Sequence, residues 1–495
     1  MSSLIHEIQS AHTPDSLAAQ LHGEAGVMLL RSLPRQSLAE AGARYDLPAA
    51  RYSFVVAHPF LTFRSTGSRC EIISGYQQST DNHQLQFGNP WHLLDSLMAR
   101  YELLDEADQP FPLGGAFGYW GYDLKNFVEA RLPRRAVNDL ELPDCHVGFY
   151  ASLVVFDHQL GKTWIVATGL AADGSRSEAR AKEQADWWQA RLVGGDGVSP
   201  SPINSGAQYA CPPKSNLART QFLAAVARAQ RYIRAGDIYQ VNLSQRLTAP
   251  CDCTGWELFQ RLAAVSPAPF AAFIDCGDFQ IASTSPELFL RLSGSHIVTR
   301  PIKGTRPRAA EATRDLQLAH ELQTSPKELA ELVMITDLLR NDLGKVCEYG
   351  SVQVPELAKL EKFAQVQHLV STVEGRLRNE VTHFAAFASC FPGGSITGAP
   401  KIRAMEIIDE LEPITRGPYT GALGYLGFNR ESQLSILIRA AVCKEDLAHF
   451  HVGAGIVADS VPEAEYDETL AKAAGFLAAL RLENQSVTIR AICMQ

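Results

Sequence analysis

Cationic side chains crowd the segment from Thr299 to Arg308, which reads Thr-Arg-Pro-Ile-Lys-Gly-Thr-Arg-Pro-Arg and sets Lys303 among Arg300, Arg306 and Arg308. Prolines and a glycine restrict its backbone, so the cations are held in place. Neighbouring like charges disfavour protonation of a lysine, which is one route to a nucleophilic amine. Taken alone, the segment predicts either a loop that binds an anion or a solvated basic loop on the surface.

Several carboxylates could act with this lysine. Glu287 stands between Pro286 and the apolar pair Leu288-Phe289, and a carboxyl in apolar surroundings has a raised pKa and can act as a general acid. A partly exposed turn glutamate is the alternative. Glu331 is one turn from Glu328 on a predicted helix, a spacing that suits a hard divalent cation but is also common on helix surfaces.

Glu468 and Lys472 share one face of a second predicted helix, where an ordinary surface ion pair is the simpler interpretation. His368 lies among apolar neighbours in a strand-like segment, which is commoner for a core histidine than for a catalytic one.

Glycine-rich segments offer backbone groups to a ligand. The run from Phe391 to Lys401 contains Thr397 and precedes a helix expected at 402–411, so free amides and a helix N-terminus would face a bound anion. It lacks the Gly-Lys-Ser/Thr ending of a nucleoside triphosphate loop. Gly453 and Gly455 lie in a predicted strand, 449–457, where small residues let a ligand touch the backbone.

The elements that must position these residues follow from periodicity. Helices are expected at 90–104, 175–192, 220–235 and 327–343, and strands at 239–246, 271–274, 279–283, 419–426 and 435–442. Arg439 stands inside the last of these strands, and Gln240 near the start of the first. Glycines, prolines and serines mark 196–215 as a linker between an N-terminal region, 1–195, and a catalytic region, 216–485.

Composition limits the class of protein. The 495 residues carry 45 basic and 54 acidic side chains, a formal charge of −9, which argues against nucleic acid as a partner. No uncharged run approaches membrane-spanning length and the N-terminus lacks the pattern of a signal peptide, so a cytoplasmic protein is expected. The ten cysteines are scattered, and Cys251 and Cys253 form a Cys-x-Cys without a second pair at zinc-finger spacing, which predicts reduced structural thiols.

Taken together, the motifs resemble those of the chorismate-utilising enzymes, in the family's order, over about residues 215 to 480. They are Gly236-Asp-Ile-Tyr-Gln240-Val-Asn, Ser285-Pro-Glu287-Leu-Phe, Pro301-Ile-Lys303-Gly-Thr-Arg-Pro, Ala330-Glu331, Gln367-His368-Leu-Val-Ser, Gly394-Ser-Ile-Thr-Gly-Ala-Pro-Lys401, Arg439, Gly453-Ala-Gly-Ile-Val and Glu465-Tyr-Asp-Glu468-Thr-Leu-Ala-Lys472.

The resemblance implies one large α/β fold of the α+β type, like that of anthranilate synthase component I. Two antiparallel sheets would pack near-orthogonally with helices outside. It implies Mg²⁺ held by Glu331 and Glu468, and substrate contacts from Tyr419, Arg439, Gly453, Gly455 and Lys472, with Thr397 in the glycine-rich loop and His368 as a site histidine.

Two positions indicate the reaction by the same resemblance. Members that add water to chorismate carry a lysine where this chain has Gln240, which favours ammonia as the nucleophile. Anthranilate synthases have an alanine at the position of Lys303. Many aminodeoxychorismate synthases have a lysine there, as this chain does. The implied reaction is therefore 4-amination, with Lys303 as the covalent nucleophile and Glu287 as general acid. Anthranilate synthesis and a non-catalytic binding protein are the alternatives.

Partners are implied as well. No Gly-x-Cys-x-Gly nucleophile loop of a glutamine amidotransferase occurs in the chain, so a separate subunit would supply ammonia in a heterodimer. Relatives build a tryptophan pocket from segments that correspond here to Ser32, Arg51, Tyr52, Pro269 and Phe270. Arg31, however, replaces the glutamate of feedback-regulated anthranilate synthases, and tryptophan binding is a hypothesis only.

Overall fold

The computed structural model describes residues 2–33, 51–75, 83–106, 108–193, 212–363 and 366–480. Within these residues the strands form two antiparallel sheets of twelve strands each. Sheet I runs in the order β1 (Leu4–Ile8), β10 (Lys162–Ala167), β9 (Ser152–Asp157), β3 (Tyr52–Val56), β2 (Met28–Arg31), β13 (Phe270–Asp275), β14 (Gln280–Ser285), β23 (Ala440–Lys444), β24 (Leu447–Ile456), β12 (Gln240–Pro250) and β11 (Lys214–Ser215), with β20 (Gly398–Ala399) also paired to β12.

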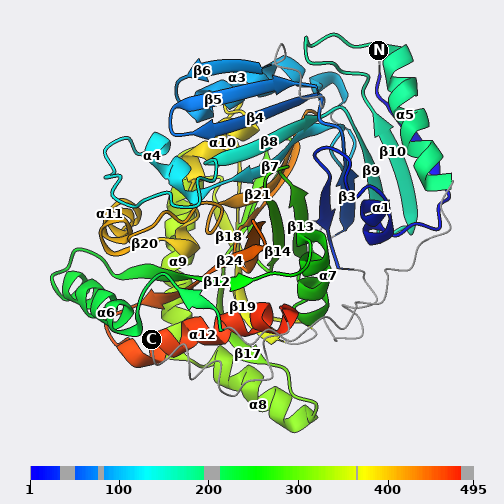
Figure 1. The fold of residues 1–495 in the computed structure, drawn as a ribbon. Helices are drawn as coiled ribbons and strands as arrows, with labels where there is room; N and C mark the ends of the chain where they lie inside the picture. The colour runs from blue at the N-terminus through cyan, green and yellow to red at the C-terminus, as the bar shows by residue number, and fades with distance from the viewer. Residues whose placement is uncertain are drawn as a thin grey trace.

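Sheet II runs in the order β17 (Ile302–Pro307), β19 (Val366–Arg376), β16 (His296–Arg300), β15 (Leu288–Ser293), β22 (Glu431–Ile436), β21 (Ala422–Gly427), β7 (Gly115–Trp120), β8 (Cys145–Tyr150), β4 (Leu61–Thr66), β5 (Arg69–Ser74) and β6 (His83–Phe87), with β18 (Gln353–Lys362) also on β19. In Figure 1, β4, β5 and β6 run across the page and β3, β9 and β10 run down it, so the sheets cross steeply, as expected.

Helices lie on the outer faces of the sheets. They are α1 (Pro14–Gln20), α3 (Pro90–Tyr101), α4 (Lys125–Val128), α5 (Glu178–Val193), α6 (Arg219–Arg234), α7 (Gly255–Val265), α8 (Ala312–Gln323), α9 (Pro326–Gly344), α10 (His383–Cys390), α11 (Lys401–Leu411) and α12 (Pro462–Ala479), with 3₁₀ turns η3 (Leu104–Glu106), η4 (Tyr122–Leu124) and η5 (Gly394–Ile396).

Strand alternation builds the core between the sheets. In β9, Leu153 and Val155 belong to a buried cluster that also contains Phe54 of sheet I and Tyr425 of sheet II, while Val154 packs on the opposite face. The rings of Phe54 and Tyr425 meet edge to face at 5.1 Å. Because successive side chains of a strand point to opposite faces, one apolar run covers both sides of sheet I.

Regions before and after the predicted linker share both sheets. Sheet I joins β2 to β13, and sheet II joins β7 to β21. Most of the linker itself, residues 196–211, and the end of the predicted catalytic region, 481–485, lie outside the described residues.

Two predicted elements were wrong, and both corrections concern the candidate site. The segment Thr299 to Arg308 is not a loop, because it forms the end of β16 and β17, which both pair with β19. The single strand expected at 435–442 is two strands in different sheets, β22 and β23. Arg439 lies between them with φ +50°, where the chain crosses from sheet II to sheet I.

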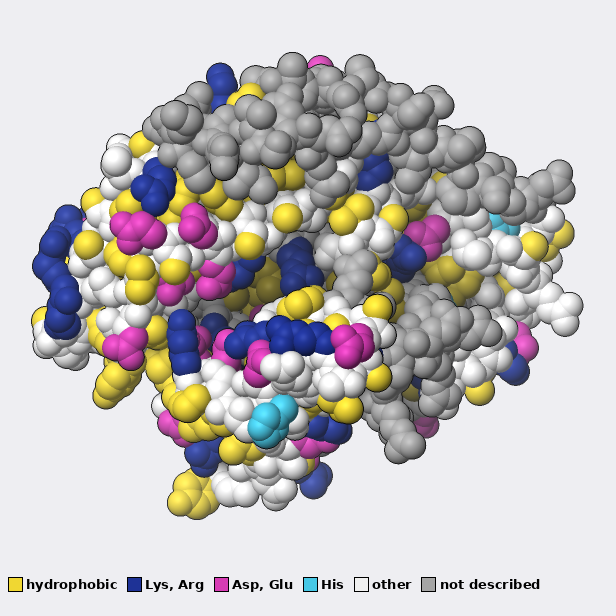
Figure 2. Space-filling model, turned by 90° about the horizontal axis from the view of Figure 1, so that it is seen from below, with side chains coloured by type: hydrophobic (Ala, Val, Ile, Leu, Met, Phe, Trp, Pro, Cys, Tyr) yellow, Lys and Arg dark blue, Asp and Glu magenta, His cyan; other side chains and the backbone are white. Residues whose placement is uncertain are grey.

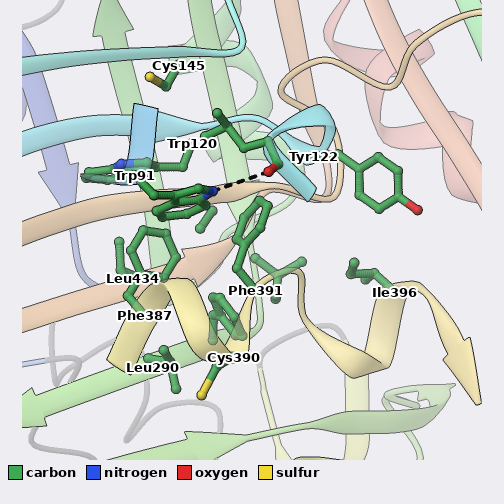
Figure 3. Packing of buried hydrophobic residues seen from close by; sticks show 14 of the residues in the cluster. Trp91, Trp120, Tyr122, Cys145, Leu290, Phe387, Cys390, Phe391, Ile396 and Leu434 are labelled. Atoms are coloured by element: carbon green, nitrogen blue, oxygen red, sulfur yellow. Dashed lines mark hydrogen bonds between the residues drawn. The ribbon is translucent and has the colours of Figure 1, made fainter. Parts of the chain in front are cut away.

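An aromatic cluster anchors the glycine-rich segment (Figure 3). Trp91 of α3 donates its indole N–H to the carbonyl of Leu124 at 3.2 Å, and its ring lies 5.1 Å from that of Phe391. Phe387 of α10 packs against Phe391 as well, at 5.7 Å. Because only Pro392 separates Phe391 from Gly393 and Gly394, this cluster holds the start of the segment that carries Ser395.

None of the helices that the structure describes is long and apolar enough to cross a membrane.

Candidate functional site

A cavity of about 800 Å³ lies where the two sheets approach α7, α9 and α12. The molecule is hollowed on the face shown in Figure 2, where Lys and Arg side chains lie next to Asp and Glu side chains. Ten of the residues expected in the site line the cavity: Glu287, Lys303, Glu331, His368, Tyr419, Arg439, Gly453, Gly455, Glu468 and Lys472.

Two expected residues do not line the cavity. Thr397 is fully buried, and its hydroxyl donates within its own segment, toward the carbonyls of Gly393 and Gly394. Gln240 is buried behind Gly455: a Cβ placed on Gly455 would lie 2.5 Å from Gln240 Nε2. The glycine-rich segment also meets the cavity at a different point from the one expected. Ser395 and Ile396 line the cavity, whereas the first residues of α11, the helix expected to face an anion, do not.

Glu287 lies where the chain crosses from β14 in sheet I to β15 in sheet II, and its side chain is buried. Burial raises the pKa of its carboxyl to about 7, although a hydrogen bond from Ser395, the charge of Lys303 and the amide of Ile302 favour the ionised form. The apolar neighbours in the sequence therefore indicated the environment correctly. A carboxyl with a pKa near 7 can hold or release a proton at neutral pH.

Lys303 projects from β17 into the same space. Its Nζ would be 3.9 Å from a Cβ on Gly455, and its charge lowers the pKa of both Glu287 and Glu331. The amine is thus close to a buried acid and to a second carboxylate, an arrangement suited to a nucleophile that exchanges protons with its neighbours.

The arginines of the basic segment are held in ion pairs and do not crowd Lys303 as the sequence suggested. Arg300 forms an ion pair with Glu361, Arg306 with Glu328 at 3.4 Å, and Arg308 with Asp315 at 2.8 Å. The fold explains the difference, because α8 and α9 pack on β17 and bring carboxylates to it, whereas Arg300 ends β16 and meets a carboxylate of β18. Arg306 and Arg308 thereby support the strand that presents the lysine.

Arg439 is a cation suited to an anionic ligand. Its Nη1 donates weakly to Ser266 Oγ at 3.5 Å, and within the described residues it makes no ion pair. Burial lowers the pKa of its guanidinium, the direction expected for a cation removed from water without a counterion. A carboxylate of a ligand would supply the missing charge.

Tyr419, which also lines the cavity, points its hydroxyl at the backbone of β24. A Cβ on Gly453 would lie 2.9 Å from that hydroxyl and 2.7 Å from Asn242 Oδ1, so glycine is required for this close approach. Lys472 donates to the carbonyl of Gly453 at 2.8 Å and forms an ion pair with Glu468 at 2.7 Å. The surface ion pair considered from sequence is present, and it lies at the edge of the cavity.

The donor set for a metal ion consists of carboxylates. The described residues contain no group of three His, Cys, Asp or Glu side chains arranged to hold a metal ion. Burial raises the pKa of Glu331; Lys303 and Lys327 oppose the rise, while Glu328 and Glu468 add to it. A dication would relieve this repulsion, and hard carboxylate oxygens that leave room for water and substrate suit Mg²⁺, so the residues present fit the expected ion.

His368 is a buried neutral acceptor. Burial, with a smaller effect from Arg439, lowers the pKa of its imidazole to about 4. Its Nδ1 lies 3.3 Å from the carbonyl of Gly304, which can only accept, and 2.9 Å from Thr305 Oγ1. With Nδ1 as the donor, Nε2 is left as an acceptor at the cavity.

The segments expected to form a tryptophan pocket do come together, apart from Arg51. Ser32, Tyr52, Pro269 and Phe270 line a small cavity, whereas Arg51 donates to Asp157 at 2.9 Å. The cavity measures about 20 Å³, which admits a water molecule but not an indole. The described residues that line this cavity leave no room for tryptophan, and tryptophan binding stays a hypothesis.

Among the residues of the large cavity that sequence reasoning missed, three have polar or aromatic contacts within the site. Ser395 bonds the Glu287 carboxyl, Asn242 directs an unpaired oxygen at Gly453, and His451 stacks on Tyr419 with ring centroids 5.0 Å apart. Ser395 and Asn242 stood inside quoted motifs, so closer attention to their polar side chains could have found them. His451 had no signal of its own in the sequence.

The fold and the site define an enzyme-like cavity for a small polyanion, with an acid, an amine and carboxylates within reach. A model of the chorismate binding enzyme family matches residues 57–478, and the chain belongs to this family.

Relatives and a solved structure carry two different names. The chain is 43% identical over 394 residues to anthranilate synthase component 1 of Thermus thermophilus, covering 78% of this chain and 83% of that protein. It is 36% identical over 440 residues to aminodeoxychorismate synthase component 1 of Bacillus subtilis, covering 89% and 91%. The structure of anthranilate synthase component I from Streptococcus pneumoniae superposes with a TM-score of 0.73 at 32% identity, covering 86% of this chain and 92% of that one.

Proposed function

We propose that the chain is the synthetic component of an aminodeoxychorismate synthase. It would convert chorismate and ammonia to 4-amino-4-deoxychorismate and water, for p-aminobenzoate and folate synthesis. The observation that carries the proposal is the placement of the Lys303 amine in the large cavity next to the buried acid Glu287.

The chemistry divides between these two side chains. The Lys303 amine attacks ring carbon 2 while both ring double bonds shift and the bond from carbon 4 to its hydroxyl breaks. Glu287 gives its proton to that hydroxyl, which leaves as water. Ammonia then attacks carbon 4, both double bonds shift back and the bond from carbon 2 to the lysine nitrogen breaks. The new ammonium group returns a proton to Glu287. The enolpyruvyl group is retained.

Other residues of the cavity hold the substrate. Arg439, which makes no ion pair within the described residues, and the Tyr419 hydroxyl beside Gly453 would bind the enolpyruvyl carboxylate. Glu331 and Glu468 would hold Mg²⁺, which when bound would neutralise the ring carboxylate. Ammonia would come from a separate glutamine amidotransferase subunit, consistent with the component 1 names of the relatives.

Anthranilate synthesis is the second candidate function, because relatives named anthranilate synthase component 1 reach 43% identity. The same cavity would accept the same substrate, so the products decide. The purified chain is incubated with chorismate, Mg²⁺ and an ammonium salt, and the products are separated by chromatography. Aminodeoxychorismate that becomes p-aminobenzoate only after a lyase is added supports the proposal, and fluorescent anthranilate without added lyase refutes it.

Lys303→Ala tests the covalent role. We expect it to slow aminodeoxychorismate formation by about 100-fold or more and to let anthranilate-type product appear. Lys182→Ala is the control, since that side chain is 70% exposed on α5. Unaltered turnover of Lys303→Ala would remove the covalent step while leaving the binding roles of the cavity in place.

A further inference from the structure

Three thiols meet at the end of β12, outside the large cavity. Cys251 directly follows the strand, Cys253 is two residues on, and Cys443 comes from β23. Cys251 Sγ lies 3.6 Å from Cys253 Sγ, and the thiol of Cys251 also bonds that of Cys443. The eight cysteines of the described residues are all free. Sequence spacing predicted separate structural thiols, but the fold gathers these three.

The central thiol has the surroundings of a reactive one. Hydrogen bonds from Cys253 and Cys443 lower the pKa of Cys251, and the Arg261 cation lowers it further. Burial has the opposite effect but is outweighed. The same contacts raise the pKa of Cys253 and of Cys443, so both neighbours stay protonated donors. The Cys251 thiol also donates to the carbonyl of Cys253 at 3.3 Å, so it must release this proton before it attacks an oxidant as a thiolate.

Position along the chain selects the second thiol. Cys251 and Cys253 are only two residues apart, and their Sγ atoms lie 3.6 Å from each other. Cys443 reaches Cys251 from the end of β23, beside the turn between β23 and β24, where the Asp446 carbonyl accepts a hydrogen bond from the Cys251 amide. Cys253 is therefore the expected partner in a disulfide, and Cys443 is a hydrogen-bond donor to Cys251.

Access also favours a small oxidant. Cys251 is 4% exposed and packs in the cluster that contains Trp256 and Phe259, whereas Cys253 is partly exposed. Because Cys251 itself is buried, a small oxidant is a better fit for it than a bulky disulfide.

We propose that Cys251 is a hydroperoxide-reactive nucleophile and that Cys253 resolves the product into a reversible Cys251–Cys253 disulfide. The Cys251 thiolate attacks one oxygen of hydrogen peroxide; an S–O bond forms, the O–O bond breaks and hydroxide leaves. Sulfur loses two electrons and peroxide gains them. Cys253 then attacks the sulfenic sulfur, an S–S bond forms, the S–O bond breaks, and hydroxide takes the Cys253 proton. In sum, two thiols and hydrogen peroxide give one disulfide and two waters, and a dithiol reductant reverses the change.

The test uses the full chain with Cys211 and Cys493, both outside the described residues, replaced by serine. The protein is treated with equimolar hydrogen peroxide in the presence of a chelator, remaining thiols are alkylated, and tryptic peptides are weighed. Cys251 and Cys253 share the peptide that follows Arg246 and ends at Arg261. We expect that peptide to lose two hydrogen atoms at least about tenfold faster than any other cysteine is oxidised, and to regain them with dithiothreitol.

Two variants separate the roles. Cys253→Ser should stop at a sulfenic acid on Cys251 that a 1,3-dione reagent labels, whereas Cys443→Ser should still form the disulfide, more slowly. The proposal is overturned if the 247–261 peptide keeps both thiols, if all cysteines oxidise at similar rates, or if Cys251 is found joined to Cys443. The peptide map of the parent chain decides even if a variant fails to fold.

Discussion

Glu287→Gln should change how the stability of this protein depends on pH. Burial raises the pKa of the Glu287 carboxyl from 4.5 to about 7. Between these values the unfolded chain has released this proton while the folded chain keeps it, so the folded state binds more protons and stability falls as the pH rises. The loss begins near pH 4.5 and is complete above pH 7. At 1.36 kcal/mol per pH unit it amounts to about 3 kcal/mol.

Glutamine is neutral throughout and similar in size, so it avoids this loss. We expect the free energy of unfolding of Glu287→Gln, minus that of the parent, to be about 3 kcal/mol larger at pH 8 than at pH 4.5, because only the parent loses stability as the pH rises. Urea titrations of both proteins across this range give the difference, in which the contributions of other titrating groups cancel.

Glu445→Gln is the matched control, because that side chain is 80% exposed and forms an ion pair at 3.8 Å with the adjacent Lys444. Its difference from the parent should be flat with pH to within about 0.5 kcal/mol. A Glu287→Gln difference that is equally flat would mean that Glu287 ionises as it does in water. That result would refute both the inference that Glu287 is a buried acid and its proposed role as proton donor.

Four further outcomes are expected. Arg439→Gln should raise the KM for chorismate about 10- to 100-fold through loss of a charged hydrogen bond, with no fall in Tm; an unchanged KM would contradict this role. Gly455→Ala should lower turnover about tenfold, because its Cβ would lie 2.5 Å from Gln240 Nε2, whereas Gly344→Ala, with nothing within 4 Å, should not. Glu331→Gln should raise the Mg²⁺ concentration for half-maximal rate at least about tenfold, and an equal requirement in both proteins would argue against a metal ligand. Isothermal titration of tryptophan-free protein with tryptophan should give no heat of binding, because the cavity measures about 20 Å³.

Local features were predictable from the sequence. The helix expected at 327–343 is α9, Pro326–Gly344, because Ser325 caps it and Pro326 suits its first turn. The apolar neighbours of Glu287 along the chain suggested a raised pKa, with an exposed turn glutamate as the alternative, and burial in the fold raises that pKa to about 7. The family motifs also identified most residues of the cavity, since each motif contributes a short stretch whose own types carry the signal.

Other features were not predictable because they depend on where the chain crosses between sheets. Periodicity in 435–442 favoured one strand, yet the crossing at Arg439 breaks it and turns that side chain into the cavity. Thr397, in a family motif, bonds its own segment and does not reach the cavity.

By itself, then, the sequence determined the local elements, the family and the set of chemically capable side chains, because capping, periodicity and motif residues act over a few positions. Only the tertiary structure decided which charges are paired. It matched Arg300 with Glu361, left Arg439 without an ion pair among the described residues, and brought Cys443 to Cys251. Pairing and desolvation depend on contacts between residues far apart in the chain, which no local pattern records.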